Sequence, residues 1–212
     1  MRGIGPGSSI VNTAKRGVRE ALVAMGFLPP EMDGGGCILH VSDTPSSTYG
    51  YLVRAVRSMG PSVLVHTGDV ADEVKLGLWP QLIDEYRRKV GKLARLLDGC
   101  GCRLIVTCGN HDDPEVLKEA LPWGEIYPRW ANLDARGRSI SAAHRFKDLE
   151  RLGDVNLFGH DLEVTTSTEG DRLILNGIER MNLVDPAAMR VRFVRYPPGT
   201  DDERTLKRRR GL

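Results

Sequence analysis

The chain contains 212 residues, of which 41% are hydrophobic and 27% are charged, and its formal net charge at pH 7 is +2. This length and composition are typical of a globular protein with one α/β domain and a substantial core. No apolar run approaches the ~20 residues that a membrane-spanning helix requires, and no apolar signal region stands at the N-terminus. We therefore expect a cytoplasmic protein without a membrane partner.

Residues 1–36 are expected to form an N-terminal helix followed by a linker. From Thr13 to Phe27 the sequence has the apolar spacing of an amphipathic helix, and Gly26 indicates its end. Residues 31–36 then read as the linker. The sequence leaves open whether this helix packs on the sheet or on another subunit.

Three polar segments each follow an apolar run that predicts a buried strand, and helical periodicity at 48–59 and 80–97 separates them. The runs cover residues 37–42, 62–66 and 102–108. The polar residues that follow them are Asp43, Asp69, Asp72, Asn110, His111 and Asp112. Ligands of open α/β sheets bind at the carboxyl ends of strands, so these side chains indicate a site rather than a core.

Side-chain alternation along a strand separates the first two histidines from this site. His40 lies three residues before Asp43, and His66 lies three residues before Asp69. Each imidazole should therefore point away from the side taken by its aspartate. We expect packed or hydrogen-bonded strand residues here, not metal ligands. For Asp72 two interpretations stay open, a second carboxylate in the same cleft or a residue that caps the next segment or orients an imidazole.

Two further histidines follow later strands. His144 comes after the run 138–143, and His160 comes after the run 155–158 with one glycine between. With Asp69 and Asn110 they form a set of oxygen and nitrogen ligands that suits Zn, Mn or Fe better than Ca or Mg. The short strands after residue 138, which end with residues 189–196, predict a second sheet packed against the first.

These segments together resemble the calcineurin-like metallophosphoesterases, and most closely the small bacterial and archaeal phosphodiesterases. The family pattern runs Asp-x-His, Gly-Asp-x-x-Asp, Gly-Asn-His-Asp/Glu, a lone His, then Gly-His-x-His, and the resemblance covers residues 37–182. It implies an α/β fold of the four-layer αββα type, in which two mixed sheets are flanked by helices. We expect this domain to span residues 37–198.

The resemblance also implies the cofactor. Family members hold two metal ions side by side and bridge them with one aspartate, which corresponds to Asp69. One ion would be a divalent transition metal, Mn, Zn or Fe, and the ligands implied for it are Asp69, Asn110, His144 and His160.

The second ion of the family pattern has an incomplete ligand set in this chain. It would take Asp43 and the shared aspartate, but Pro45 and Leu162 stand where the family has its two histidines. Proline and leucine side chains cannot ligate a metal. Asp161 and Glu163 flank the second departure and could donate an oxygen instead, so the second ion is either lost or held differently.

His111 corresponds to the family's imidazole that lies over the phosphate and protonates the leaving group, with Asp72 or Asp112 orienting its ring. We therefore expect a metal-dependent phosphoesterase that uses metal-activated water, more specifically a phosphodiesterase acting on a small soluble substrate. The alternative is a binding module that keeps the fold but has lost hydrolysis.

Residues 199–212 form the last expected segment, a basic tail that includes Arg204 and Lys207. We expect this tail to be solvated rather than to bind nucleic acid. The four cysteines lack the paired spacing of a zinc ribbon, and we expect them to be reduced, although a disulfide between Cys37 and Cys102 is conceivable. The sequence specifies neither the substrate nor the oligomeric state.

Overall fold

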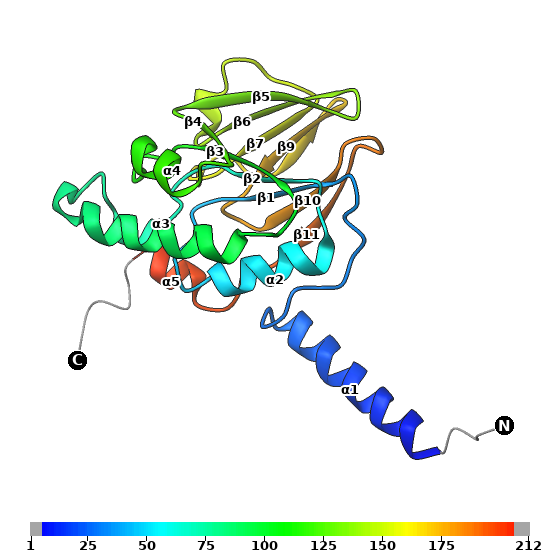
Figure 1. Cartoon of the computed structure of the whole chain (residues 1–212). Helices are drawn as coiled ribbons and strands as arrows, with labels where there is room; N and C mark the ends of the chain where they lie inside the picture. The colour runs from blue at the N-terminus through cyan, green and yellow to red at the C-terminus, as the bar shows by residue number, and fades with distance from the viewer. Residues whose placement is uncertain (1–5, 206–212) are drawn as a thin grey trace.

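A computed structural model describes residues 6–205, which form two β-sheets packed face to face (Figure 1). The first sheet has six strands in the order β11-β10-β1-β2-β3-β4, and the second has five in the order β5-β6-β7-β9-β8. Each sheet combines parallel with antiparallel pairs. The expected α/β sandwich of two mixed sheets is therefore confirmed.

Most strands expected from apolar runs are found within two residues of their expected ends. The first sheet contains β1 (Ile38–Val41), β2 (Val63–His66), β3 (Arg103–Thr107), β4 (Glu125–Tyr127), β10 (Met181–Asp185) and β11 (Arg190–Val194). The second contains β5 (Trp130–Ala135), β6 (Arg138–Ala143), β7 (Val155–Phe158), β8 (Ser167–Glu169) and β9 (Arg172–Asn176).

The helices lie on one side of the sandwich (Figure 1). They are α1 (Pro6–Ala24), α2 (Tyr49–Met59), α3 (Ile83–Leu97), α4 (Pro114–Ala120) and α5 (Thr200–Arg204), with short 3-10 turns η1 (Asp72–Val74), η2 (Pro80–Leu82) and η3 (Phe146–Asp148). Asp113 caps α4 through its Oδ1, which accepts the N–H groups of Glu115 and Val116.

Alternating side chains divide the buried residues into two cores. Ile38 of β1 points between the sheets, where it meets Ile140 and Leu157 of the second sheet. Its neighbour Leu39 points the other way and joins the core beneath α2, α3 and α4, which also contains Leu117. The central strands are thus buried on both faces, which explains why their sequences are continuously apolar.

A connecting segment covers the outer face of the second sheet. The connection between β6 and β7, which includes η3, packs there, and Ser141 Oγ donates a hydrogen bond to the Arg151 carbonyl at 2.7 Å. Figure 1 shows no α-helix on that face within residues 6–205. On this face Trp130 Nε1 also donates to Ser141 Oγ at 2.6 Å.

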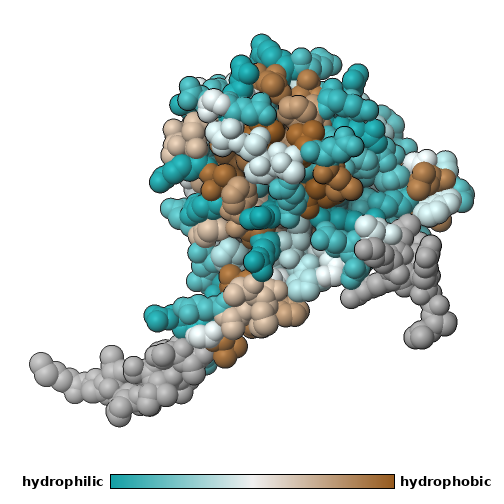
Figure 2. All heavy atoms as spheres, turned by 180° about the vertical axis from the view of Figure 1, so that it is seen from behind, coloured by the Kyte–Doolittle hydropathy of each residue, from teal (hydrophilic) through white to brown (hydrophobic). Residues whose placement is uncertain are grey.

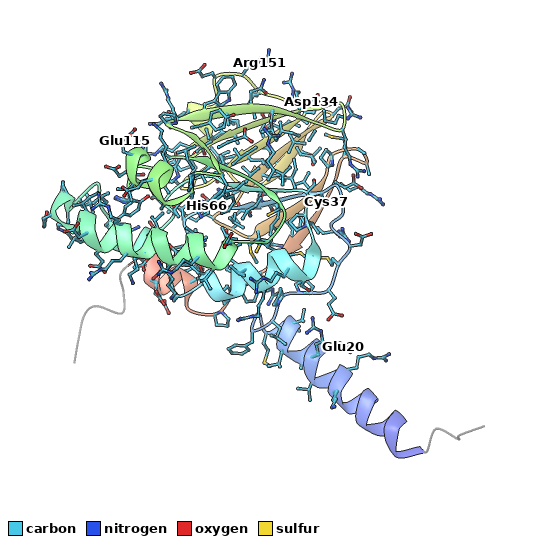
Figure 3. All side chains as sticks on the ribbon, viewed as in Figure 1. Glu20, Cys37, His66, Glu115, Asp134 and Arg151 are labelled. Atoms are coloured by element: carbon cyan, nitrogen blue, oxygen red, sulfur yellow. The ribbon has the colours of Figure 1, made fainter. Side chains whose placement is uncertain are left out.

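The N-terminal helix α1 starts earlier than the sequence indicates and projects away from the sandwich (Figure 1). Glu20 on this helix lies well outside the body in Figure 3. Val18, Met25 and Phe27 of this segment are each more than half exposed, and tan and brown spheres mark its junction with the body in Figure 2. In Figure 1 the ribbon of α1 lies clear of both sheets. No helix within residues 6–205 is both long and apolar enough to cross a membrane.

The expectation of a solvated tail is wrong for α5, whereas residues 206–212, with Lys207, lie outside the described residues. Arg204 is only 7% exposed. Its Nε donates to the Asp43 carbonyl at 2.7 Å, and its NH2 donates to the Ser42 carbonyl at 2.9 Å. Its guanidinium carbon lies 4.3 Å from the Tyr196 ring centroid. The sequence shows only a run of charged residues. It does not show that the fold gives Arg204 carbonyl acceptors and an aromatic ring to pack on.

We predict that Arg204→Ala lowers the free energy of unfolding by about 2–4 kcal/mol, because buried carbonyl groups left without donors cost about 1–3 kcal/mol each. Urea denaturation followed by circular dichroism measures this change. Arg195, which is exposed, serves as the matched control, and its substitution by alanine should change the stability by less than about 0.5 kcal/mol. Equal losses in the two variants would contradict the anchoring role of Arg204.

Candidate metal centre

The five residues expected to bind metal come together where five strands end. Each follows its strand directly or by a short turn: Asp43 after β1, Asp69 after β2, Asn110 after β3, His144 after β6 and His160 after β7. Ligand atoms of the two aspartates and two histidines all lie within 4.8 Å of one another. Asn110 Oδ1 lies 3.1 Å from His144 Nε2, so it borders the same group.

Three of these residues have backbones that side-chain-bearing residues rarely adopt. The φ angles are 49° for Asp43, 53° for Asp69 and 57° for His160. Such left-handed conformations cost about 1–3 kcal/mol each and concentrate at functional sites. The turns aim the side chains back across the strand ends, toward one another.

Asp112 fixes the two central turns. Its carboxylate accepts the backbone N–H groups of Asp69 at 2.7 Å, Val70 at 2.9 Å and Gly109 at 2.8 Å, and the Tyr86 hydroxyl at 2.8 Å. The loops are so close that a Cβ on Gly109 would lie 2.2 Å from Asp69 Oδ1. Asp112 therefore positions the backbone. It makes no hydrogen bond to His111, so of the two residues expected to orient the His111 ring, Asp72 or Asp112, it is not the one.

The hydrogen bonds of His144 show where its free lone pair points. Its Nδ1 lies 2.7 Å from the Thr67 carbonyl, which can only accept, so Nδ1 carries the proton. Burial lowers the pKa of His144, so the ring is neutral at pH 7 and Nε2 keeps a lone pair. This lone pair faces Asn110 Oδ1 at 3.1 Å and Asp69 Oδ2 at 3.5 Å.

Asp69 Oδ2 completes this convergence. It is buried and has no hydrogen-bond donor within the described residues. Burial, followed by the charges of Asp112 and Asp43, raises the pKa of Asp69 well above its usual value. When Asp69 is ionised, three acceptor atoms face one another, which is unfavourable unless a cation lies between them. The donor set fits a transition metal ion.

Asp43 and His160 close the group on its other side. His160 Nδ1 lies 3.7 Å from Asp43 Oδ1 and 3.9 Å from Asp69 Oδ2. Burial alone would raise the pKa of Asp43, but its interactions with His160 and the nearby imidazole of His144 outweigh burial and hold it at about 2. Asp43 is therefore ionised at every pH at which the protein is expected to work.

A second group contains Asp69, Asp72 and His111, again within 4.8 Å. His111 Nδ1 accepts the Gly77 N–H at 3.2 Å, so the proton of the neutral ring lies on Nε2. Burial, reinforced by Lys75, lowers the pKa of His111 to about 4. Asp72 forms a buried ion pair with Lys75, and burial raises its pKa to about 6. The N-cap of η1 is Ala71 and not Asp72, which disfavours the capping interpretation.

The two strand histidines are buried and hydrogen-bonded, as expected. His40 Nε2 lies 2.9 Å from Thr67 Oγ1, and His66 Nε2 lies 2.8 Å from Thr44 Oγ1. Burial lowers the pKa of His40 to about 3 and that of His66 to about 4. Figure 3 shows His66 inside the body rather than at its surface.

The two positions that depart from the family pattern do not provide ligands. The Pro45 carbonyl accepts the Thr48 N–H at 2.9 Å, just before α2 begins, and Leu162 is 83% exposed. Asp161 does not replace the missing imidazole, because its Oδ2 accepts the Phe146 N–H at 2.6 Å. Asp43 is thus the one ligand of the second ion that lies in the group besides the shared Asp69.

One charged residue beside the group was not expected from the sequence. Arg145 NH2 lies 3.2 Å from Asn110 Oδ1 and 3.3 Å from His160 Nε2. The only sequence signal was a basic residue directly after His144. Arginine is too common at surfaces for that position alone to indicate a site.

Comparison with known families agrees with this geometry. The model of the calcineurin-like phosphoesterases matches residues 38–201, which is most of the chain. The chain belongs to the calcineurin-like phosphoesterase family. Its members are metal-dependent, so the family and the convergent ligands point to the same chemistry. No significant match to this chain is found among curated protein sequences.

Solved structures resemble this calcineurin-like phosphoesterase at low identity. The E. coli phosphoesterase Yfce is 15% identical, with a TM-score of 0.49 over 76% of this chain and 99% of that one. A protein of unknown function from Aquifex aeolicus, AQ665, is 18% identical, with a TM-score of 0.36 over 51% of this chain and 60% of that one. A third structure is 11% identical, with a TM-score of 0.52 over 80% of this chain and 100% of that one. At this identity the similarity shows the fold alone.

We predict that Mn²⁺ binding releases protons, because the raised pKa of Asp69 means that the metal-free carboxyl retains a proton that a cation must displace. Calorimetry in buffers of different ionisation enthalpy measures this release. Asp69→Asn should abolish the binding, whereas Asn at the exposed Asp134 should leave it unchanged.

The same pKa shift predicts how Asp69 affects stability without metal. The folded protein binds more protons at Asp69 than the unfolded chain does, so its contribution to the free energy of unfolding falls as pH rises above about 4. Asp69→Asn should therefore stabilise the metal-free protein at pH 7. Thermal melts that show the reverse would contradict a raised pKa of Asp69 in the folded protein.

Proposed function

We propose that this protein is a metal-dependent phosphodiesterase that hydrolyses a small soluble substrate. The observation that carries the proposal is the convergence of acceptor atoms from Asp69, Asn110 and His144, with the Nε2–H of His111 near the same aspartate. Such a site can hold a cation and offer a proton donor on one side of it.

The residues proposed to hold the ion are Asp69, Asn110, His144 and His160, with Asp43 at the edge of the group. Imidazole and carboxylate together favour Mn, Zn or Fe over Mg or Ca. When bound, the ion would supply Lewis acidity toward a phosphoryl oxygen and lower the pKa of a bound water. One ion per chain is the proposed stoichiometry, because the neighbouring position keeps only Asp43 and the shared Asp69.

His111 is the proposed donor to the leaving group. The Gly77 N–H fixes its tautomer, so that Nε2 presents a proton. The Lys75–Asp72 ion pair lies on the same side and keeps the buried Asp72 charge compensated. Asp72 then assists His111 electrostatically, and Lys75 prevents it from acting as a free base.

The charge of the group favours a diester over a monoester. Asp43 and Asp69 carry two negative charges, which balance one divalent ion, so the site offers less positive charge than a site with two ions. A diester carries one negative charge at pH 7, whereas a monoester carries nearly two.

Nucleic acid is not proposed as a partner, because the buried Arg204 is unavailable to it. The four free cysteines support the proposed cytoplasmic location.

The alternative is a module that binds a metal and a partner but does not hydrolyse. Pro45 and Leu162 favour it, since they remove two imidazoles that the family uses. Mn²⁺ binding by a wild-type protein that hydrolyses no phosphoester would support this alternative.

We predict that His111→Asn reduces Mn²⁺-dependent hydrolysis by about 10²–10⁴-fold for an alkyl phosphodiester, the range expected for loss of a general acid. The loss should be smaller for bis(p-nitrophenyl) phosphate, because nitrophenolate leaves without protonation. Rates for both esters, with one Mn²⁺ per chain verified in both proteins, measure this difference. Equal rates for the variant and the wild type would remove His111 from the mechanism.

A further inference from the structure

Arg145 places a cation directly beside the proposed metal ligands. Its NH2 group lies 3.2 Å from Asn110 Oδ1 and 3.3 Å from His160 Nε2. A guanidinium has five N–H groups. These two contacts leave three of them without a protein partner in the part of the chain that the structure describes. The side chain is partly exposed, so those groups can meet a bound molecule.

The backbone at Arg145 is held from the neighbouring strand end. The N–H of Phe146 donates to Asp161 Oδ2 at 2.6 Å, and the Phe146 ring packs edge-on against Phe158 at 5.2 Å between centroids. Asp161 directly precedes Leu162, the position where the expected imidazole is missing. The segment around Leu162 therefore supplies no metal ligand, but it fixes the backbone next to Arg145.

The contact between Arg145 and His160 is incompatible with a cation in the group. His160 Nδ1 faces Asp43 Oδ1 and Asp69 Oδ2, whereas Nε2 faces Arg145. A neutral imidazole that directs its Nδ1 lone pair at a cation carries its proton on Nε2. Nε2 then cannot accept from a guanidinium. Loading the site therefore frees Arg145 while its backbone stays fixed.

The charge balance gives the freed guanidinium a function. Asp43 and Asp69 together neutralise one divalent ion, and Asp72 is already paired with Lys75. A loaded site with one ion would therefore have no excess positive charge for an anionic phosphoryl group. Arg145 adds one positive charge and a planar set of donors that matches two phosphoryl oxygens.

We infer that Arg145 binds the phosphoryl oxygens of the substrate and takes the electrostatic place of the missing second cation. The inference rests on the proposed function, and it assigns the specificity for an oxyanion to a residue outside the metal-ligand set. Asp161 is a positioning residue that acts through the Phe146 backbone.

Mn²⁺ affinity and the affinity of the Mn²⁺-loaded protein for inorganic phosphate, both by calorimetry, test the inference. Arg145→Gln should weaken phosphate binding about 10- to 100-fold, the loss expected for one charge-assisted pair, without weakening Mn²⁺ binding. Arg145→Lys should give an intermediate phosphate affinity, since it keeps the charge but not the fork. Gln at the exposed Lys147, two residues along, is the matched control and should change neither affinity.

The outcomes separate this inference from the proposed function. Unchanged phosphate affinity in Arg145→Gln, or no phosphate binding by the loaded wild type, would overturn the inference even if the protein hydrolyses diesters. Weaker Mn²⁺ binding in this variant would overturn it as well, because Arg145 would then support the metal ligands instead. Loss of phosphate affinity in Arg145→Gln would support the inference even if no ester is hydrolysed. That result would reject only the proposed hydrolase function.

Discussion

The site depends on one carboxylate that does not touch the cation position. Asp112 accepts backbone N–H groups from Asp69 and Val70 after β2 and from Gly109 after β3. Charge-assisted hydrogen bonds of this kind are about twice as strong as neutral ones. They hold the two loops in contact and set the direction of the Asp69 side chain before any ligand arrives. The geometry of the group is therefore a property of the folded chain, in the sense of a preorganised site.

This preorganisation is locally unfavourable, and the sandwich around it offsets the cost. Asp69 is fully buried near three other carboxylates, and three residues of the group have left-handed backbones. The strands that precede these three residues are β1, β2 and β7, and every residue of these strands is buried. Strands fixed on both faces cannot relax to separate the like charges. The rigidity of the sheet thus keeps these acidic and acceptor groups together.

The sequence predicted the parts of this arrangement that depend on local pattern. Buried strands appear as apolar runs, so β1, β2, β3, β6 and β7 and the residues at their ends could be located. The edge strand β8 is short and exposed, and it carries no such pattern. Arg145 and Arg204 were missed for another reason. Whether an arginine meets solvent, carbonyl groups or a metal ligand is decided by segments far away in the chain, and composition alone indicates only a charge.

The departures at Pro45 and Leu162 are best understood together with Asp43, which remains in the group. Asp43 Oδ2 accepts from Ser42 Oγ at 2.5 Å and from the backbone N–H of His160 at 3.2 Å, so only Oδ1 faces the group. The carboxylate thus fixes the turn that aims His160, a task that persists whether or not a second ion is bound. This structural task explains why Asp43 stays buried although the two histidines of the family pattern are absent. Asp43 and Arg145 face opposite ring nitrogens of His160, an arrangement that agrees with the proposed centre for one cation.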